Sequence, residues 1–126
     1  MKPERIVFDA NIWLSYFINN RTEEITRLIL FNDLTVLSSP YLIAELEDVL
    51  KRPKFEKAAS MPDVHHIALH QKLTSFHTTM PRSDRSPDPK DNYLFDLAIQ
   101  HSATHLVTGE KRLLAMKEVE ASKSYH

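Results

Sequence analysis

Two acidic residues follow short apolar runs that have the composition of buried strands. Asp9 comes directly after residues 6–8 (Ile-Val-Phe), and Glu110 follows residues 106–108 (Leu-Val-Thr) and Gly109, the one glycine of the chain. Such runs, without alternating polar residues, are typical of strands that are buried on both faces of a parallel sheet. The carboxyl ends of these strands border the ligand crevice of an open α/β sheet. Both carboxylates are therefore candidates for a functional site, although each could instead serve the start of the next helix.

A third candidate, Asp91, is selected by the phase of a helix. The helix expected after Pro89 has an apolar stripe that, extended backward by three and four residues, reaches Asp91. Asp96 points the other way and is expected to be solvated. A carboxylate in line with an apolar stripe is costly to bury without a partner. Asp91 is therefore either a functional acid or the partner of Asp88 in a capping box, and the two roles are compatible.

The fourth candidate comes from the helix expected after Ser39 and Pro40, a cap followed by proline at the first helical position. Glu45 and Glu47 lie on opposite edges of the apolar face of this helix. Periodicity alone does not choose between them.

Several inward-facing acids together indicate a particular chemistry. The chain has no cysteine and a single glycine, which excludes thiolate zinc sites, thiol nucleophiles and glycine-rich phosphate loops. Carboxylate oxygens suit hard divalent cations such as Mg²⁺ or Mn²⁺, and converging carboxylates repel one another unless a cation is bound. The corresponding reaction is metal-assisted hydrolysis of phosphodiester bonds.

These acids need a scaffold, and the chain alternates short apolar strands with amphipathic helices. This alternation predicts a parallel sheet in an α/β sandwich. A short strand near residues 79–80 and an edge strand within residues 119–126 are weaker expectations. The expected strands are 6–8, 35–38 and 105–108, and the expected helices are 11–18, 22–31, 40–50, 55–59, 62–76, 89–101 and 113–116.

Composition sets the broad class. A chain of 126 residues, 42% hydrophobic and 26% charged, fits one domain over residues 1–126. Its net charge of −1 gives no general attraction to nucleic acid, so such contact would need a local basic patch. No apolar run approaches the roughly 20 residues that span a bilayer, and the N-terminus has no signal-peptide pattern. We expect a soluble, cytoplasmic protein.

Four separated segments of the chain, in the right order, resemble the PIN domain. The resemblance is greatest to the VapC-like toxins of bacterial and archaeal toxin–antitoxin pairs. The segments are residues 6–11 (IVFDAN), Glu45 after Ser39 and Pro40, residues 88–92 (DPKDN) and residues 106–111 (LVTGEK).

This resemblance implies a three-layer α/β/α sandwich around a short, mainly parallel sheet. It also implies an endoribonuclease that depends on Mg²⁺ or Mn²⁺, is commonly a homodimer and is inhibited by a cognate antitoxin protein. It favours Glu45 over Glu47. The residues it assigns are the metal-binding and catalytic acids Asp9, Glu45, Asp91 and Glu110, with Asn11 and Thr108 in supporting places.

Two departures from the family pattern favour an alternative function. Glu110 stands where the family usually has Asp, and Arg112 replaces a further acid. A degenerate PIN domain that binds RNA or protein without cleaving it is therefore the alternative.

Two other groups of residues invite a functional interpretation. His66 and His70 are four residues apart and could share a helix face, as zinc ligands do, but solvated or partner-facing histidines are the better interpretation. Trp13, Tyr16 and Phe17 follow Asp9 at helical spacing, and for them core packing is preferred to an interaction surface.

Overall fold

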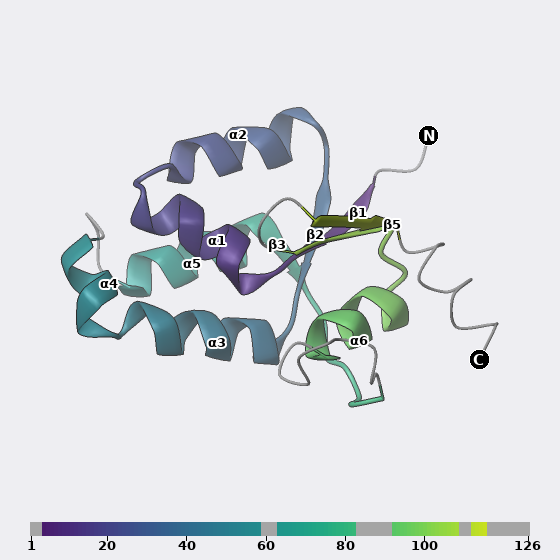
Figure 1. Cartoon of the computed structure of the whole chain (residues 1–126). Coiled ribbons are helices and arrows are strands. Elements are labelled where there is room, and N and C mark those ends of the chain that lie inside the picture. The colour runs from purple at the N-terminus through teal and green to yellow at the C-terminus, as the bar shows by residue number, and fades with distance from the viewer. Residues whose placement is uncertain (1–3, 59–62, 83–91, 109–111, 116–126) are drawn as a thin grey trace.

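The computed structural model describes residues 4–58, 63–82, 92–108 and 112–115 (Figure 1). Strands and helices alternate along most of this chain. The elements are β1 (Arg5–Phe8), α1 (Ala10–Ile18), α2 (Thr22–Phe31), β2 (Thr35–Ser38), α3 (Pro40–Leu50), α4 (Pro53–Ala58), α5 (Asp63–Leu73), β3 (Thr74–Phe76), α6 (Asn92–Gln100), β4 (His105–Thr108) and β5 (Arg112–Ala115).

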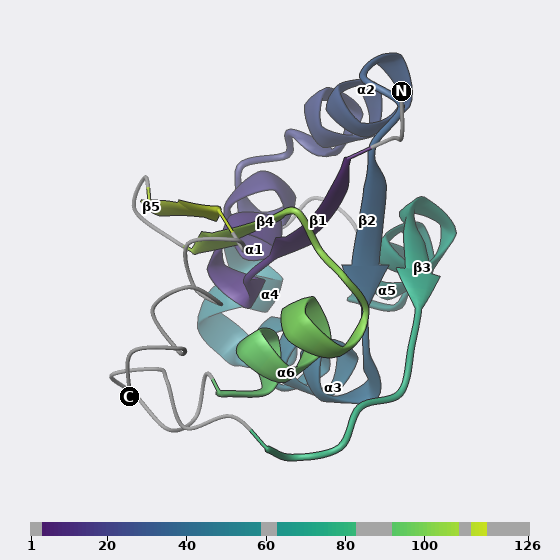
Figure 2. The same ribbon diagram turned by 90° about the vertical axis from the view of Figure 1, so that its right-hand side faces the viewer.

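The strands form one sheet in the order β3-β2-β1-β4-β5, which Figure 2 shows from the edge strand β3 to the edge strand β5. The first four strands of that order are parallel, and β5 pairs antiparallel with β4. Because β1 is central, its carboxyl end has neighbours on both sides. The predicted α/β class with a mainly parallel sheet is confirmed.

Helices cover both faces of the sheet. Phe8 and Ser38 occupy equivalent positions on neighbouring strands; Phe8 contacts Trp13 of α1, and Ser38 bonds to His70 of α5, so α1 and α5 lie on one face. The chain then reverses direction across the sheet between β3 and β4, and right-handed crossovers place α6 on the other face, against β1, β2 and β4. The result is the three-layer α/β/α arrangement.

The helices at the carboxyl edge of the sheet begin where the sequence predicts. Asp9 is the N-cap of α1, and Ser39 is the N-cap of α3, with its Oγ accepting the Leu42 N–H at 3.3 Å and Pro40 at the first helical position. The next helix, α2, begins at Thr22, as expected, directly after Arg21. The cap expected at Ser39 is therefore confirmed, and Asp9 fills the capping role that the sequence left open.

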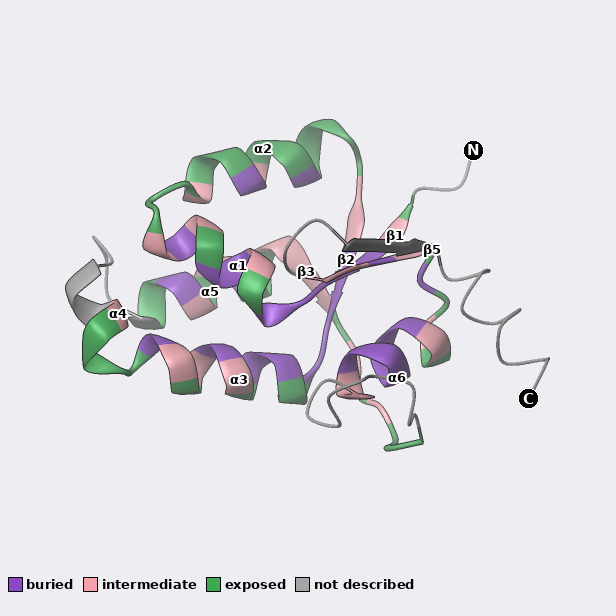
Figure 3. Ribbon diagram, in the orientation of Figure 1, coloured by how far each residue is buried: buried purple, intermediate pink, exposed green. Residues whose placement is uncertain are grey.

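The core is apolar and continuous across the layers. Trp13 and Phe17 have no exposed surface, which confirms core packing for these two rings, and Tyr16 is half-buried at the margin. Figure 3 shows the contrast between the largely buried α6 and the exposed outer side of α2. Among the described residues, no helix is long and apolar enough to cross a membrane.

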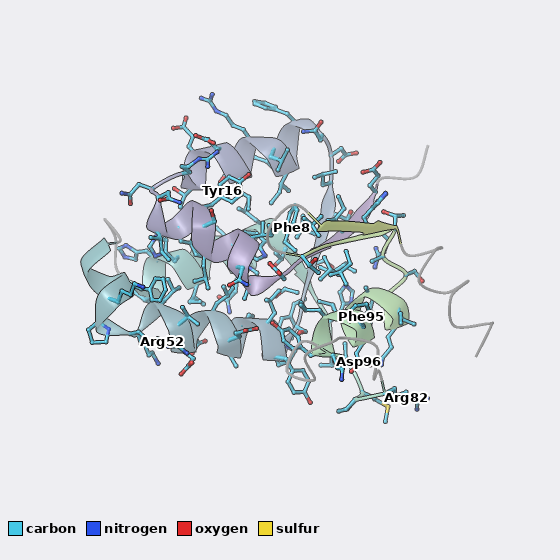
Figure 4. The ribbon with its side chains drawn as sticks, in the orientation of Figure 1. Phe8, Tyr16, Arg52, Arg82, Phe95 and Asp96 are labelled. Atoms are coloured by element: carbon cyan, nitrogen blue, oxygen red, sulfur yellow. The ribbon has the colours of Figure 1, made fainter. Side chains whose placement is uncertain are left out.

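The prediction that Asp96 is solvated is wrong. Residues 94–98 are all buried, because α6 has the sheet on one side and residues 78–82 on the other. The Asp96 carboxylate accepts the backbone N–H of Arg82 at 3.1 Å, and the two labelled residues lie next to each other in Figure 4. Gln100 makes two further bonds to the backbone of Met80, at 2.9 and 2.6 Å. A covering segment outside α6 thus overrides the helical phase.

Two elements near the sheet edges also differ from prediction. The helix expected to reach Phe76 ends at Leu73, and Thr74–Phe76 forms β3, while residues 79–80 form no strand. The helix expected around residues 113–116 is instead β5. Short apolar runs fit either a helix or a strand, and pairing with a neighbouring strand decides between them. The edge strand expected within residues 119–126 lies outside the described residues.

The interpretation of His66 and His70 as solvated is also wrong. Both are buried between α1 and α5, with exposed fractions of 1% and 0%. His66 stacks on Phe17 with ring centroids 4.7 Å apart, and His70 packs edge-on against Trp13 at 4.3 Å. His70 Nε2 lies 2.7 Å from Ser38 Oγ, and burial lowers the pKa of His70 to about 4. These histidines belong to the core.

Candidate active site

Asp9 lies at the carboxyl end of the central strand. Its Oδ1 accepts the Ile12 N–H at 2.9 Å, and its own N–H donates to the Val107 carbonyl at 3.0 Å, so one residue joins β1, β4 and the start of α1. Only 8% of its surface is exposed. The two interpretations of Asp9 are therefore compatible: it caps a helix, and it holds a carboxylate at the position where parallel sheets bind ligands.

Glu45 lies midway along α3 and is half-buried. Its Oε2 accepts a hydrogen bond from the hydroxyl of Tyr93, the second residue of α6. This bond joins α3, which follows β2, to the amino-terminal turn of α6. Glu45 therefore has a fixed partner on the element that directly follows Asp91 in the chain.

Sequence reasoning missed Tyr93. In the printed sequence, it lies one turn before Leu97, so it has the position of an ordinary apolar residue on the inner face of the helix. Nothing in the periodicity distinguishes a tyrosine that packs from one whose hydroxyl bonds to a carboxylate. The available signal was chemical: a half-apolar side chain with one polar end, close to acids in sequence, usually finds a hydrogen-bond partner when buried.

The two residues predicted to support the site, Asn11 and Thr108, lie close to Asp9. Asn11 is exposed in the first turn of α1, two residues after Asp9. Thr108 is the last residue of β4, directly after Val107, whose carbonyl binds the Asp9 N–H, and it is half-buried. Asp9 directly follows β1 and Thr108 ends the neighbouring β4, so both lie at the same edge of the sheet.

Asp91 and Glu110 lie outside the described residues, so the structure does not test whether the four predicted acids share one site. Within the residues that are described, no group of three or more His, Asp and Glu side chains could hold a metal ion. The carboxylates of Asp9 and Glu45 are nevertheless the oxygen donors that Mg²⁺ and Mn²⁺ take from proteins. The chemistry of these donors fits such an ion.

The sheet is mainly parallel, and the Asp9 carboxylate is held at the carboxyl end of its central strand. This is the arrangement of open α/β domains, which bind their ligands at the carboxyl ends of the strands. A family model described as PIN domain matches residues 5–112 of the chain. The chain therefore belongs to the PIN-domain family, whose members are generally nucleases and typically use divalent metals. No curated protein and no solved structure matches the chain.

Proposed function

We propose that this PIN domain is a divalent-metal-dependent endoribonuclease that hydrolyses RNA phosphodiester bonds. The observation that supports it best is the fixed carboxylate of Asp9 at the carboxyl end of β1. An acid held by two backbone contacts at this edge is already oriented before a ligand arrives. Such preorganisation is what a catalytic metal site requires of its scaffold.

In this proposal Asp9, Glu45 and Asp91 bind Mg²⁺ or Mn²⁺, and Glu110 completes the site. A bound ion of this kind activates water and offsets the charge that develops during displacement at phosphorus. The chain's own contribution is orientation: the Ile12 N–H fixes Asp9, and the Tyr93 hydroxyl fixes Glu45. One of the acids accepts the proton of the attacking water.

The biological role we propose is that of the toxin in a type II toxin–antitoxin pair. The support for this role is the sequence resemblance to VapC-like toxins together with membership of the PIN-domain family. A cognate antitoxin protein and a second copy of the chain would then be its partners. Co-expression with candidate small proteins encoded beside it would test the role, because a cognate antitoxin should relieve growth arrest and co-purify with the chain.

Replacing Asp9 with Asn tests the nuclease function. Asn is as good an N-cap as Asp, so α1 should keep its start, whereas the neutral amide is a much poorer ligand for a cation. We expect Mn²⁺-dependent cleavage of a fluorescent single-stranded RNA to fall by at least about 100-fold. Circular dichroism and thermal unfolding of Asp9→Asn should match the parent protein.

Asp33→Asn is the matched control. Asp33 is exposed, and its φ of 50° is a conformation that Asn also adopts readily. This variant should cleave RNA at the parent rate. Cleavage retained by purified Asp9→Asn would overturn the assignment, whereas RNA binding by the parent without any products in Mn²⁺ would favour the degenerate PIN domain that Glu110 and Arg112 suggest.

A further inference from the structure

Two tyrosines from different helices lie together beside Glu45. Tyr41 is in the first turn of α3 and Tyr93 in the first turn of α6, and their ring centroids are 6.2 Å apart with the planes tilted by 33°. Tyr41 is 46% exposed, although it is large and aromatic. Because Tyr41 and Glu45 are four residues apart on one helix, their side chains lie on the same face of α3. An exposed ring and a candidate catalytic acid therefore adjoin.

The pair of rings is already ordered. The Tyr93 hydroxyl donates to Glu45, which restricts the rotation of the Tyr93 ring, and that ring in turn contacts Tyr41. Aromatic rings held at this separation attract one another, so Tyr41 is less free than a solvated side chain. A surface ring that is already ordered loses little entropy when it binds a flat ligand.

The charge of the chain indicates what this surface contributes. A protein with a net charge of −1 has no overall attraction to a polyanion, and the acids of the site repel phosphates until a cation is present. Stacking of a base on an aromatic ring supplies affinity that does not depend on charge. Four residues rise about 6 Å along a helix, so a base on Tyr41 and a phosphate near Glu45 would belong to the same or adjacent nucleotides.

We propose that Tyr41 and Tyr93 form a stacking platform that binds one base of single-stranded RNA next to Glu45. That the bound base belongs to RNA rests on the proposed nuclease function. The platform adds the binding of a base, which the acids cannot perform. Tyr41 contacts the base, while Tyr93 both supports that ring and acts as a positioning residue for Glu45. Base-paired RNA would bind poorly, because its bases are already stacked on one another.

The test measures binding without cleavage. The probes are a fluorescein-labelled oligouridylate and an abasic ribose-phosphate chain of the same length, titrated by fluorescence anisotropy in EDTA. For the parent protein, the abasic chain should bind roughly 5- to 100-fold more weakly than the oligouridylate. Tyr41→Leu should lose a similar factor for the oligouridylate and no longer distinguish the two probes. Tyr41→Phe, which keeps the ring, should bind within about twofold of the parent.

Phe31→Leu is the matched control, because Phe31 is an aromatic residue, 81% exposed, at the far end of α2. It should bind both probes as the parent does. Equal binding of the two probes by the parent, or unchanged binding by Tyr41→Leu, would overturn the platform and leave Mn²⁺-dependent cleavage untouched. Conversely, discrimination between the probes without cleavage products in Mn²⁺ would preserve the platform and overturn the nuclease function.

Tyr93→Phe separates the second role from the first. The ring remains against Tyr41, so the variant should still bind the oligouridylate more tightly than the abasic chain, whereas Glu45 loses its hydroxyl partner. We expect the dissociation constant for Mn²⁺, followed from the paramagnetic resonance signal of the free ion, to rise roughly 10- to 100-fold. An unchanged Mn²⁺ affinity would overturn the positioning role of Tyr93.

Discussion

Two polar pairs lie on consecutive elements of this protein and have opposite surroundings. Ser38 ends β2 and bonds to His70 of α5, and Glu45, on the helix that follows, bonds to Tyr93 of α6. Ser38 and His70 have no exposed surface, whereas Glu45 is half-buried beside the exposed ring of Tyr41. The same kind of contact therefore serves the core in one pair and faces a candidate site in the other.

The difference comes from what covers each pair. His70 is enclosed between α1 and α5 with Trp13 against its ring, and its Nδ1 has no hydrogen-bond partner among the residues that the structure describes. A charged imidazolium would be costly there, so the ring is held neutral. The Glu45 pair is covered less completely, since Glu45 is half-buried and the ring next to Tyr93, that of Tyr41, is exposed. Burial on all sides makes a polar group structural, and one open side leaves it accessible to a ligand.

The largest expected effect tests the half-buried pair, Glu45 and Tyr93. Glu45→Gln keeps the size of the side chain and an oxygen that can accept the Tyr93 bond, but removes the charge that binds a cation. Mn²⁺-dependent RNA cleavage should fall by at least about 100-fold, with the free energy of unfolding changed by no more than about 1 kcal/mol. Initial rates and urea unfolding measure the two quantities.

Glu47→Gln is the control for this variant. Glu47 is also half-buried on α3, and periodicity made it the equal of Glu45. It should retain parent activity. Equal losses of cleavage in Glu45→Gln and Glu47→Gln would mean that Glu45 has no specific role in the reaction. The functional contrast between the Glu45–Tyr93 pair and the Ser38–His70 pair would then be wrong.

A smaller effect tests the fully buried pair, Ser38 and His70. The pKa of His70 is lowered to about 4 by burial, so the unfolded chain, with a pKa near 6.5, takes up the proton first as the pH falls. The stabilising effect of the neutral ring is therefore present above pH 6.5 and is lost between pH 6.5 and pH 4. From pH 7 to pH 5, His70 should remove about 2 kcal/mol from the free energy of unfolding.

His70→Gln measures how much His70 contributes to the pH dependence of the free energy of unfolding, because the variant has no titrating group at this position. From pH 7 to pH 5, its free energy of unfolding should fall by about 2 kcal/mol less than that of the parent. His65→Gln, at an exposed position on the same helix, should follow the parent curve. Parallel curves for the parent and His70→Gln would show that the ring is already protonated or open to solvent in the folded protein.

Much of the fold could be predicted because local signals and tertiary contacts agree. The strand ending at Phe8, the strand Thr35–Ser38 and the capped helix at Pro40 are all as expected. At Asp9 the sequence left capping and function open, and the structure shows the cap bond at the sheet edge that the site requires. For the two strands and the capped helix, a short stretch of chain carries enough information by itself.

The errors arise where contact with another element decides the environment of a residue. Asp96 is buried because residues 78–82 cross α6, and His70 is buried because α1 packs on α5. β5 is a strand because β4 offers it an edge. The Tyr93 hydroxyl reaches Glu45 across 48 positions of sequence. None of these contacts leaves a periodic trace in the element concerned, so a single sequence does not reveal them.

The smallest predicted effect separates the two roles that meet in Asp9. Asp9→Ala and Asp9→Asn both remove the charge, so both should be inactive to the same extent. Only Ala also removes the acceptor of the Ile12 N–H, and losing an N-cap costs about 1 kcal/mol. Urea unfolding should therefore rank the parent and Asp9→Asn together, with Asp9→Ala about 1 kcal/mol less stable. If Asn is destabilised as much as Ala, the cap depends on the charge of Asp9 and the α1 dipole rather than on a neutral acceptor, and structure and function at this acid cannot be separated by mutation.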